Sequence, residues 1–202
     1  MDRPTTTGTT SEADLARVLA QVRAGDPAAW GEIYRRYAQA IYRFCRRVLP
    51  AREDAEDATS EIFMKVQRKL GTYDSSRPFL AWLYKVASNH CWDTLRRRHI
   101  RQDRETGDLE KLPLEHPGPS QLDWMEAEHA GKEVRAALAR LPDRARMALV
   151  LRYFAEMSYE EIAETLGVRR QFVGVLLLRA RHQLRDALGP GGAHAISAGR
   201  RA

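Results

Sequence analysis

The sequence predicts an all-helical protein built from two small domains. Apolar side chains recur at helical spacing along most of the 202 residues, and no segment of any length alternates apolar and polar residues as a strand does. Prolines and acidic side chains gather in residues 101–126, between two such helical stretches. A chain of this length can form two domains, because domains commonly span roughly 50 to 200 residues.

The composition is that of a soluble protein with a real core. Hydrophobic residues make up 44% of the chain and charged residues 30%, and no apolar run is long enough to cross a membrane. The net charge of +6 favours contact with a polyanion, as in DNA-binding, ribosomal and membrane-surface proteins. The N-terminus lacks the basic-then-apolar order of a signal peptide, so we expect a cytoplasmic protein with no membrane insertion.

The sequence offers no pattern of a catalytic or metal site. Cys45 and Cys91 lie within apolar helical patterns and form no CxxC or Cys/His cluster, so we expect two buried free thiols. The six histidines are scattered, and neither a glycine-rich phosphate loop nor a nucleophile–base pair occurs. We therefore expect no catalytic residues, no metal and no cofactor, and a protein that is not an enzyme.

The first predicted domain covers residues 11–100 and follows a polar N-terminus, residues 1–10, that we expect to be disordered. Asp26 followed by Pro27 is typical of a helix start, and Pro50 and Gly71 are typical of helix ends. Four amphipathic helices are predicted: one that begins after Ser11, one from Pro27 to Pro50, one from about Glu53 to Leu70, and one from about Phe79 to Arg98.

After the acidic linker, residues 101–126, a second domain is predicted over residues 127–188, followed by a disordered tail, residues 189–202. Its strongest motif begins at Ser158, which forms a capping box with Glu161. Gly167 then permits the left-handed turn between two helices. This spacing favours a helix-turn-helix that binds nucleic acid over an ordinary helical hairpin.

The second helix of this motif, from about Arg170 to Ala187, carries more apolar residues than its core needs. Its predicted core positions are Val173, Leu177, Ala180 and Leu184. Val175, Leu176 and Leu178 are then left to face outward, where a recognition helix normally presents polar side chains to bases. The cationic and amide side chains can contact phosphates or a base, or can simply form a solvated face: Arg169, Arg170, Gln171, Arg179 and Arg181. We expect weak sequence readout here.

Two helices of the first domain carry the remaining candidate surfaces. The third places four acids opposite its apolar stripe, as a docking surface for a partner or as a solvated helix face: Asp54, Glu56, Asp57 and Glu61. The fourth mixes aromatic, amide and cationic side chains, as binding of single-stranded nucleic acid requires, although core packing also explains Trp82. Its candidates are Trp82, Tyr84, Lys85, Asn89, Arg96, Arg97 and Arg98.

Taken in order, these stretches resemble the extracytoplasmic-function (ECF) class of RNA polymerase sigma factors over residues 12–100 and 127–188. AGDPAAWGEIYRRYAQAIYRFCRRVL is similar to the start of sigma region 2, DAEDATSEIFMKVQRKL to its polymerase-binding helix, and RPFLAWLYKVASNHCWDTLRRR to the segment that melts and reads the minus-ten element. LARLPDRARMALVLRYFAEMSYEEIAETLGV resembles region 4. The resemblance implies a sigma region 2-like bundle and a sigma region 4-like helix-turn-helix, joined by a flexible linker.

The resemblance also implies partners and roles for named residues. Asp54, Asp57, Glu61 and Phe63 contact the beta-prime clamp helices of core polymerase. Asn89 stands near a flipped minus-ten base, while Trp82, Tyr84, Lys85 and the arginines at 96–98 support the separated strand. The second domain meets the beta flap and the minus-thirty-five element through Ser158, Tyr159 and the polar side chains of the recognition helix named above. An anti-sigma factor is a further expected partner, and could hold the chain at the membrane.

Three other functions stay open on the sequence. A helix-turn-helix regulator would share only the second domain, and the ordered motifs of the first domain argue against it. A degenerate sigma-like module would bind a protein through the apolar recognition helix, with weak minus-thirty-five readout. We expect that helix to be covered by an anti-sigma domain or by the first domain of the same chain. An enzyme is the remaining alternative, and no motif supports it.

Overall fold

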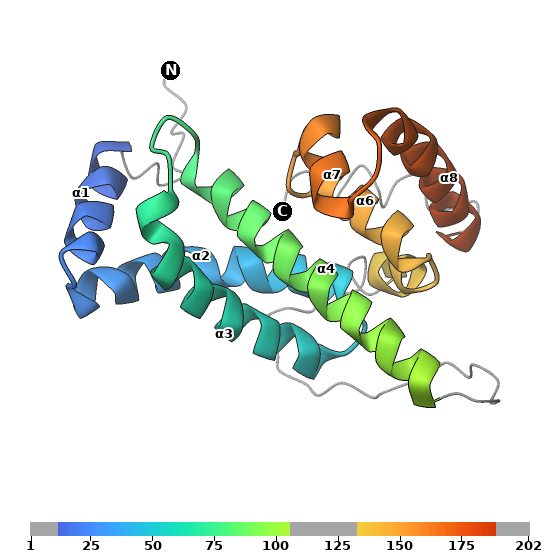
Figure 1. Ribbon diagram of the computed structural model, residues 1–202, viewed down its shortest axis with the longest axis horizontal. Coiled ribbons are helices and arrows are strands. Elements are labelled where there is room, and N and C mark those ends of the chain that lie inside the picture. The colour runs from blue at the N-terminus through green and yellow to red at the C-terminus, as the bar shows by residue number, and fades with distance from the viewer. Residues whose placement is uncertain (1–11, 106–132, 189–202) are drawn as a thin grey trace, which may run out of the picture.

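The computed structural model describes residues 12–105 and 133–188, and within them all regular structure is helical (Figure 1). No helix in these two ranges is long and apolar enough to span a membrane. The elements are α1 (Glu12–Arg23), α2 (Pro27–Val48), α3 (Arg52–Lys69), a short 3-10 turn (Leu70–Thr72), α4 (Phe79–Glu105), a helical segment at 133–139, α6 (Asp143–Tyr153), α7 (Tyr159–Leu166) and α8 (Arg170–Leu188). We refer to α1–α4 as the first domain and to the helices of 133–188 as the second domain.

The first domain is held together by the apolar faces of α2, α3 and α4, which pack against one another. Asp26 caps α2 as predicted, because its carboxylate accepts a hydrogen bond from the Ala28 N–H at 2.8 Å. The core contains completely buried side chains from all three helices: Phe44 of α2, Ile62 of α3 and Leu83 of α4. Burying each such side chain contributes roughly 1.5 to 3 kcal/mol, so these contacts fix the relative positions of α3 and α4.

The second domain contains the predicted helix-turn-helix. Ser158 and Glu161 form the capping box at the start of α7, and Gly167 ends it with a left-handed φ of 62°. The predicted core positions of α8 are confirmed, since Val173, Leu177, Ala180 and Leu184 are its buried residues. α8 packs on α6 and α7 through this stripe.

α4 is longer than predicted. It continues to Glu105 instead of ending near Arg98, so residues 101–105, assigned from the sequence to the acidic linker, are helical. This segment contains neither proline nor glycine, and the first such residue is Gly107, so no local signal stops the helix earlier. The predicted disordered N-terminus, the rest of the linker and the predicted tail lie outside the described residues.

The two domains contact each other. α2 and α4 of the first domain lie against α6 of the second, and α4 also meets α7 (Figure 1). The first domain therefore faces α6 and α7, whereas the helix that we expected it to cover was α8.

Candidate nucleic-acid interface

An acidic face lies on α3, formed by Asp57 and Glu61, both of which are exposed as predicted. Glu56, also predicted, is exposed but pairs with Arg52 of the same helix at 2.7 Å. Asp54, the fourth predicted acid, is half-buried and pairs with Arg98 of α4, with 3.6 Å between its Oδ2 and the guanidinium. Asp54 therefore helps to hold α3 against α4. The acidic face that remains available to a partner consists of Asp57 and Glu61.

Phe63, predicted as a contact of the same face, is instead a core residue that is only 3% exposed. Its ring packs edge-on against Tyr34 and Trp30 of α2, with centroid distances of 4.8 and 6.1 Å. The prediction was wrong because Phe63 follows Ile62 on the buried side of α3. Its side chain supports the acidic face from below and cannot reach a partner.

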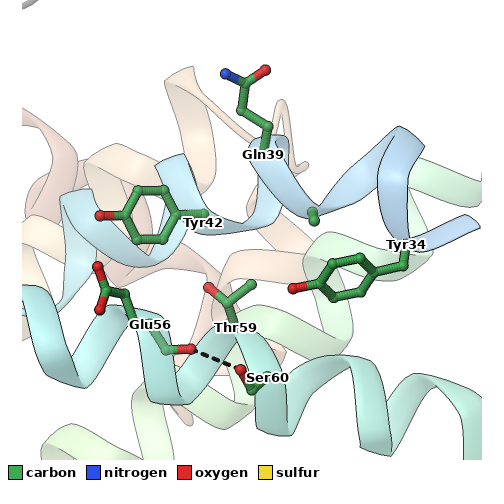
Figure 2. A pocket seen from close by; sticks show the side chains of 7 residues that line it. Tyr34, Gln39, Tyr42, Glu56, Thr59 and Ser60 are labelled. Carbon is green, nitrogen blue, oxygen red and sulfur yellow. Dashed lines mark hydrogen bonds between the residues drawn. The ribbon is translucent and has the colours of Figure 1, made fainter. Parts of the chain in front are cut away.

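A hollow of about 290 Å³ opens between α2 and α3, on the side of α3 next to Asp57 (Figure 2). The rings of Tyr34 and Tyr42 flank it, and Glu56 and Ser60 form its floor on α3. The Ser60 hydroxyl donates to the Glu56 backbone carbonyl at 3.2 Å. Tyr34 is exposed and Tyr42 is half-buried, and tyrosine rings beside a hollow are typical of protein–protein contacts, so this hollow is a candidate extension of the acidic face.

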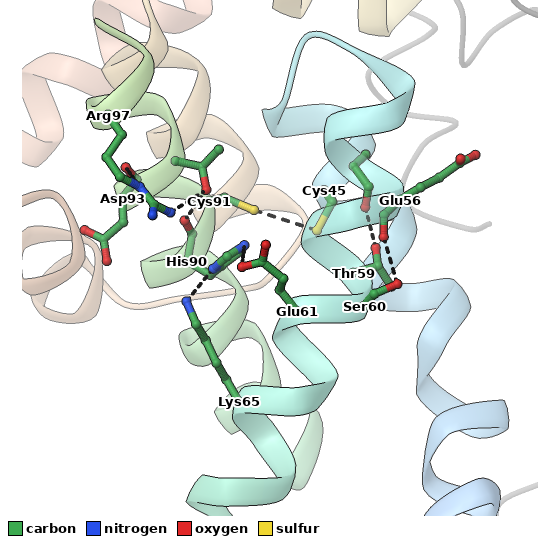
Figure 3. A network of polar contacts seen from close by, with 12 residues as sticks. Cys45, Glu56, Thr59, Ser60, Glu61, Lys65, His90, Cys91, Asp93 and Arg97 are labelled. Carbon is green, nitrogen blue, oxygen red and sulfur yellow. Dashed lines mark hydrogen bonds and ion pairs between the residues drawn. The ribbon is translucent and has the colours of Figure 1, made fainter. Parts of the chain in front are cut away.

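A buried polar network connects the acidic face to α4 (Figure 3). The His90 side chain is only 3% exposed; the Lys65 ammonium donates to its Nδ1 at 2.6 Å, and its Nε2 faces the Glu61 carboxylate at 3.8 Å. Burial lowers the pKa of His90, and the positive charge of Lys65 lowers it further. The imidazole is therefore neutral, with its proton on Nε2 toward Glu61.

Cys45 and Cys91 are buried free thiols, as predicted. They also lie next to each other, with 3.7 Å between their sulfur atoms (Figure 3). Because Cys45 is on α2 and Cys91 is on α4, this contact links the two helices in the core. The hydrogen bond to Cys45 and burial both raise the pKa of Cys91 well above its usual value. Cys91 is therefore kept in the thiol form.

The predicted nucleic-acid side chains of α4 form a stripe along one side of the helix. Lys85, Asn89 and Arg96 belong to it, and so does Trp92, which the sequence analysis missed. Asn89 and Arg96 are exposed, while Lys85 and Trp92 are half-buried. Residues 85, 89, 92 and 96 follow the helical spacing of four, three and four, and this spacing was the signal that could have identified Trp92. We call these four residues the α4 stripe.

Other predicted members of this surface do not lie on the stripe. Tyr84 is only 8% exposed, and its ring packs between Phe44 and Phe154, with centroid distances of 5.5 and 6.1 Å. Its predicted strand contact is therefore not available in this arrangement of the domains. Trp82 packs on Phe79 and Tyr73. These aromatic rings stabilise the N-terminal half of α4.

The arginines at the other end of α4 have different neighbours. Arg96 pairs with Asp93 at 3.1 Å, and Arg97 donates to the Asp93 carbonyl at 3.3 Å. Arg98 points toward α3, where it pairs with Asp54. Of these three cations, Arg96 lies on the stripe, and Arg98 serves the contact between α3 and α4.

A groove of about 560 Å³ runs between α4 and the second domain. The α4 stripe supplies Asn89, Trp92 and Arg96 to its walls, and the second domain supplies Arg144 and Glu164. Cations, an acid, an amide and an indole thus meet in one groove, a combination that suits phosphate and base contacts better than an apolar ligand.

On the second domain, the predicted polar side chains fall into two groups. Ser158 accepts from the Glu161 N–H at 3.2 Å as the cap of α7, and the Tyr159 ring lies over Gly174 of α8. These two residues therefore position α7 and α8. The exposed polar side chains are Arg169, Arg170, Gln171, Arg179 and Arg181, and Arg170 also pairs with Glu160.

An apolar patch lies beside these cations on α8. Phe172, Val175 and Leu178 are exposed by 53%, 46% and 52%, which confirms the prediction that Val175 and Leu178 face outward. Leu176, which we expected to be exposed with them, is half-buried. It falls beside the buried column that starts at Val173, so it packs partly against the domain.

Comparisons with known proteins agree with this architecture. The Sigma-70 region 2 family matches residues 33–100, and the Sigma-70 region 4 family matches residues 131–184. The RNA polymerase sigma factor CnrH of Cupriavidus metallidurans is 31% identical over 85% of this chain and 93% of its own length. The chain belongs to the family of ECF RNA polymerase sigma factors. As a sigma factor it acts in transcription initiation. Members of this family are not enzymes, which confirms the prediction made from the sequence.

Other relatives of this sigma factor carry the same description. The ECF sigma factor SigE of Mycolicibacterium smegmatis is 38% identical over 81% of this chain, which spans 64% of the length of that relative. Among solved structures, the sigma factor RpoE in complex with the anti-sigma factor NepR from Bartonella quintana matches with a TM-score of 0.58 and 22% identity, over 80% of this chain and 97% of that one. CnrH in complex with the cytosolic domain of CnrY matches with a TM-score of 0.52 and 24% identity, over 83% and 92%. These structures share the all-helical fold that the sequence predicted.

Proposed function

We propose that this sigma factor uses separate surfaces for polymerase and for DNA. The acidic face of α3 docks on the beta-prime clamp helices of core polymerase, and the α4 stripe holds the separated minus-ten strand. One observation supports this division above all. The acidic face lies on α3, whereas the stripe lines a groove on the other side of α4 from the buried His90 and Cys91, so both surfaces can be occupied together.

The stripe has the chemistry that an unpaired strand needs. Asn89 is exposed and offers both a donor and an acceptor to the Watson–Crick edge of a flipped base. The Trp92 indole provides a stacking face, and Lys85 and Arg96 provide cations for the phosphates. In this proposal Asn89 determines base preference, and the cations contribute affinity that does not depend on sequence.

The second domain binds the minus-thirty-five element and the beta flap. The exposed Arg169, Arg170, Gln171, Arg179 and Arg181 contact phosphates and one or more base edges, with Ser158 and Tyr159 positioning the helix that carries them. The apolar patch has no donor or acceptor, so its contacts to bases are limited to thymine methyl groups. We therefore propose weak sequence selection at minus thirty-five.

An anti-sigma factor is the proposed regulator. Two similar structures are complexes of a sigma factor with such a partner, NepR in one case and the cytosolic domain of CnrY in the other. Exposed apolar side chains on α8 supply contact area for a protein of this kind. In this proposal the chain works in the cytoplasm, bound to polymerase at the nucleoid. An anti-sigma factor anchored in the membrane can hold the chain at the membrane instead.

The test is reconstitution of the full chain with core polymerase, followed by genome-wide run-off transcription and alignment of the start sites. Asn89→Ala should lower open-complex formation about tenfold and relax preference at one minus-ten position, because a good base contact contributes roughly 1 to 3 kcal/mol. Gln67→Ala is the matched control, since Gln67 is an exposed amide on α3. Equal melting and equal base preference in both variants would contradict the assignment of Asn89.

The apolar patch supports a second candidate, a degenerate sigma factor that serves as a protein-interaction module. Phe172, Val175 and Leu178 stand where base-reading side chains are expected, and each exposes about half of its surface. The same reconstitution separates the two functions. A module of this kind would bind core polymerase or another protein without yielding promoter-specific transcripts.

A further inference from the structure

The second domain contacts the α4 stripe at two points, Lys85 and Trp92. At the first, the Glu164 carboxylate of α7 accepts a hydrogen bond from the Lys85 ammonium at 3.0 Å. Further along, the Arg144 guanidinium of α6 lies 5.5 Å from the centre of the Trp92 ring. A DNA strand bound along the stripe would need the same ammonium and the same ring face.

We propose that the α6–α7 surface of the second domain covers the α4 stripe in the free chain, and that Glu164 takes the place of a nucleic-acid phosphate on Lys85. The ligand of this surface is thus the minus-ten-binding surface of the same chain. The proposal rests on the minus-ten assignment made above. It makes the second domain a competitor of the promoter strand, in addition to a reader of minus thirty-five.

Charge supports the placement of Glu164 as a substitute for phosphate. A carboxylate and a phosphate both accept charge-assisted hydrogen bonds from an ammonium, so Glu164 can make the same kind of contact with Lys85 that a phosphate would make. Lys69 of α3 and Arg96 of α4 also line the groove, beside the single acid Asp93, so its first-domain side carries a net positive charge that attracts anions. The Glu164 side chain is 68% exposed, which means that the core of the second domain does not depend on it.

The two domains are also held together by an aromatic contact, in addition to the Lys85–Glu164 ion pair. Phe154, just after α6, lies over the Arg47 guanidinium at 4.0 Å and against the Tyr84 ring at 6.1 Å. Burial lowers the pKa of Arg47 to about 10, and the nearby Arg135 lowers it too. Side chains of both domains thus share an interface from which water is largely excluded, and aromatic contacts there resist salt better than an exposed ion pair.

The contact leaves other surfaces of the chain accessible. The acidic face on α3 and the apolar patch on α8 both stay exposed. The covered chain can therefore present its polymerase-docking surface while its strand-binding surface is blocked. This arrangement differs from our sequence-based expectation that the first domain would cover α8.

The separation of the domains can be measured in the full chain with a fluorophore pair. Ser75→Cys in the first domain and Gln183→Cys on α8 place one label on each, because both positions are exposed. The native Cys45 and Cys91 are completely buried and should remain unlabelled. Binding of a single-stranded minus-ten oligonucleotide to the same protein, without polymerase, gives the second readout.

Glu164→Lys should widen the separation and tighten oligonucleotide binding about fivefold, the ratio expected for an exposed ion pair at the upper end of its usual strength. Asp186→Lys on α8 is the matched control, since it makes the same change in charge at an exposed site of the same domain. It should leave the separation unchanged and tighten binding less. Combining Lys85→Glu with Glu164→Lys restores an ion pair and should restore the short separation.

Phe154→Ala gives an independent measurement and should also widen the separation. Equal separation and equal oligonucleotide affinity in the Glu164→Lys and Asp186→Lys proteins would overturn the proposal. A wider separation without tighter binding would overturn the masking of the stripe. If Lys85→Ala then leaves binding unchanged as well, the minus-ten assignment itself fails, whereas a loss of binding keeps that assignment and rejects only the competition.

Discussion

His90 lies inside the first domain, between the surface that we assign to polymerase and the surface that we assign to DNA. It follows Asn89 directly in α4, and its two ring nitrogens face Lys65 and Glu61 of α3. The ammonium of Lys65 can donate to the ring only if Nδ1 carries no proton. A neutral His90 is therefore part of the contact that sets the distance between α3 and α4.

This arrangement predicts a loss of stability in mild acid. Burial lowers the pKa of His90, as do Lys65 and Arg97, against the opposite effect of Glu61 and Asp93. The unfolded chain has the ordinary histidine pKa of about 6.5, so below that pH it takes up a proton that the folded protein refuses. The free energy of unfolding should fall as the pH drops from there to the depressed pKa of the folded state.

Urea unfolding at about pH 7.5 and about pH 5.5 measures this effect. His90→Gln should reduce the difference between the two midpoints, because its amide can still accept from Lys65 but does not titrate. His182→Gln, at an exposed site on α8, should leave the difference as it is in the unchanged protein. An equal pH dependence in all three proteins would show that His90 is not the group responsible.

The two thiols predict a second measurable property. Cys45 and Cys91 are fully buried, and the pKa of Cys91 is raised, so neither supplies an accessible thiolate. A disulfide reagent for thiols should react with neither in the native protein and with both after unfolding. The Ser75→Cys protein is the control, because its added thiol is exposed and should react at once. Rapid reaction of a native cysteine would contradict the packing of α2 on α4.

Individual side chains were predictable where burial and chemistry agree. Asp57 and Asn89 are polar and lie off the apolar stripe, so their exposure followed from helical spacing alone. Phe63 was assigned to a binding surface by resemblance, and Tyr84 by the mixed side chains of its helix as well as by resemblance, but each has aromatic neighbours that the sequence does not reveal. Trp92 was missed because an indole in an amphipathic helix is normally read as a core residue.

Helix boundaries were predictable where a capping or breaking residue occurs. Asp26 with Pro27 and Ser158 with Glu161 marked the starts of α2 and α7 correctly. The end of α4 was misplaced because residues 99–105 have no stop signal, and the linker was predicted from acidic residues together with prolines that begin only at residue 113. In α8 the spacing identified the buried column, but it could not decide how far Leu176, next to that column, is covered.

The composition of α8 predicts how the holoenzyme responds to the minus-thirty-five sequence. Phe172, Val175 and Leu178 can distinguish thymine from other bases only through its methyl group. Replacing one contacted thymine by uracil removes that methyl and should weaken binding about fourfold, since a buried CH₂-sized group contributes roughly 0.8 kcal/mol. Thymine-to-uracil changes in the spacer serve as the control. If uracil has no effect at any minus-thirty-five position, the apolar patch does not face the bases.

The relation between the two domains was not predictable from the sequence. Glu164 occupies an ordinary exposed position of α7, and nothing in its neighbours indicates Lys85, 79 positions earlier in the chain, as its partner. Phe154 follows α6 and could equally pack within its own domain. Periodicity identifies which face of a helix is apolar, but residues 145–151 of α6 are all buried, so its pattern does not say which side of the helix meets the first domain. Only the structure places α6 and α7 against α4.

That contact predicts the order in which partners bind. The acidic face is exposed in the free chain while the α4 stripe is covered, so core polymerase can bind first and promoter DNA cannot bind well until the domains separate. Adding core polymerase to the doubly labelled chain should widen the separation even without DNA. The rate of widening should rise with polymerase concentration and not with DNA concentration, because DNA binds only after the domains have separated.

Charge reversal on the acidic face tests the first step of this order. Asp57→Arg should weaken core binding and reduce the extent of domain separation at a given polymerase concentration, since a like-charged side chain opposes docking. Asp57 is the better choice than Glu61, because Glu61 also faces His90 and its replacement would disturb the core. Asp14→Arg, an exposed acid on α1, makes the same charge change and should leave both readouts unaltered. If promoter DNA alone opens the chain as readily as polymerase does, then the α6–α7 cover is too weak to set the order, and polymerase docking and strand capture are independent events.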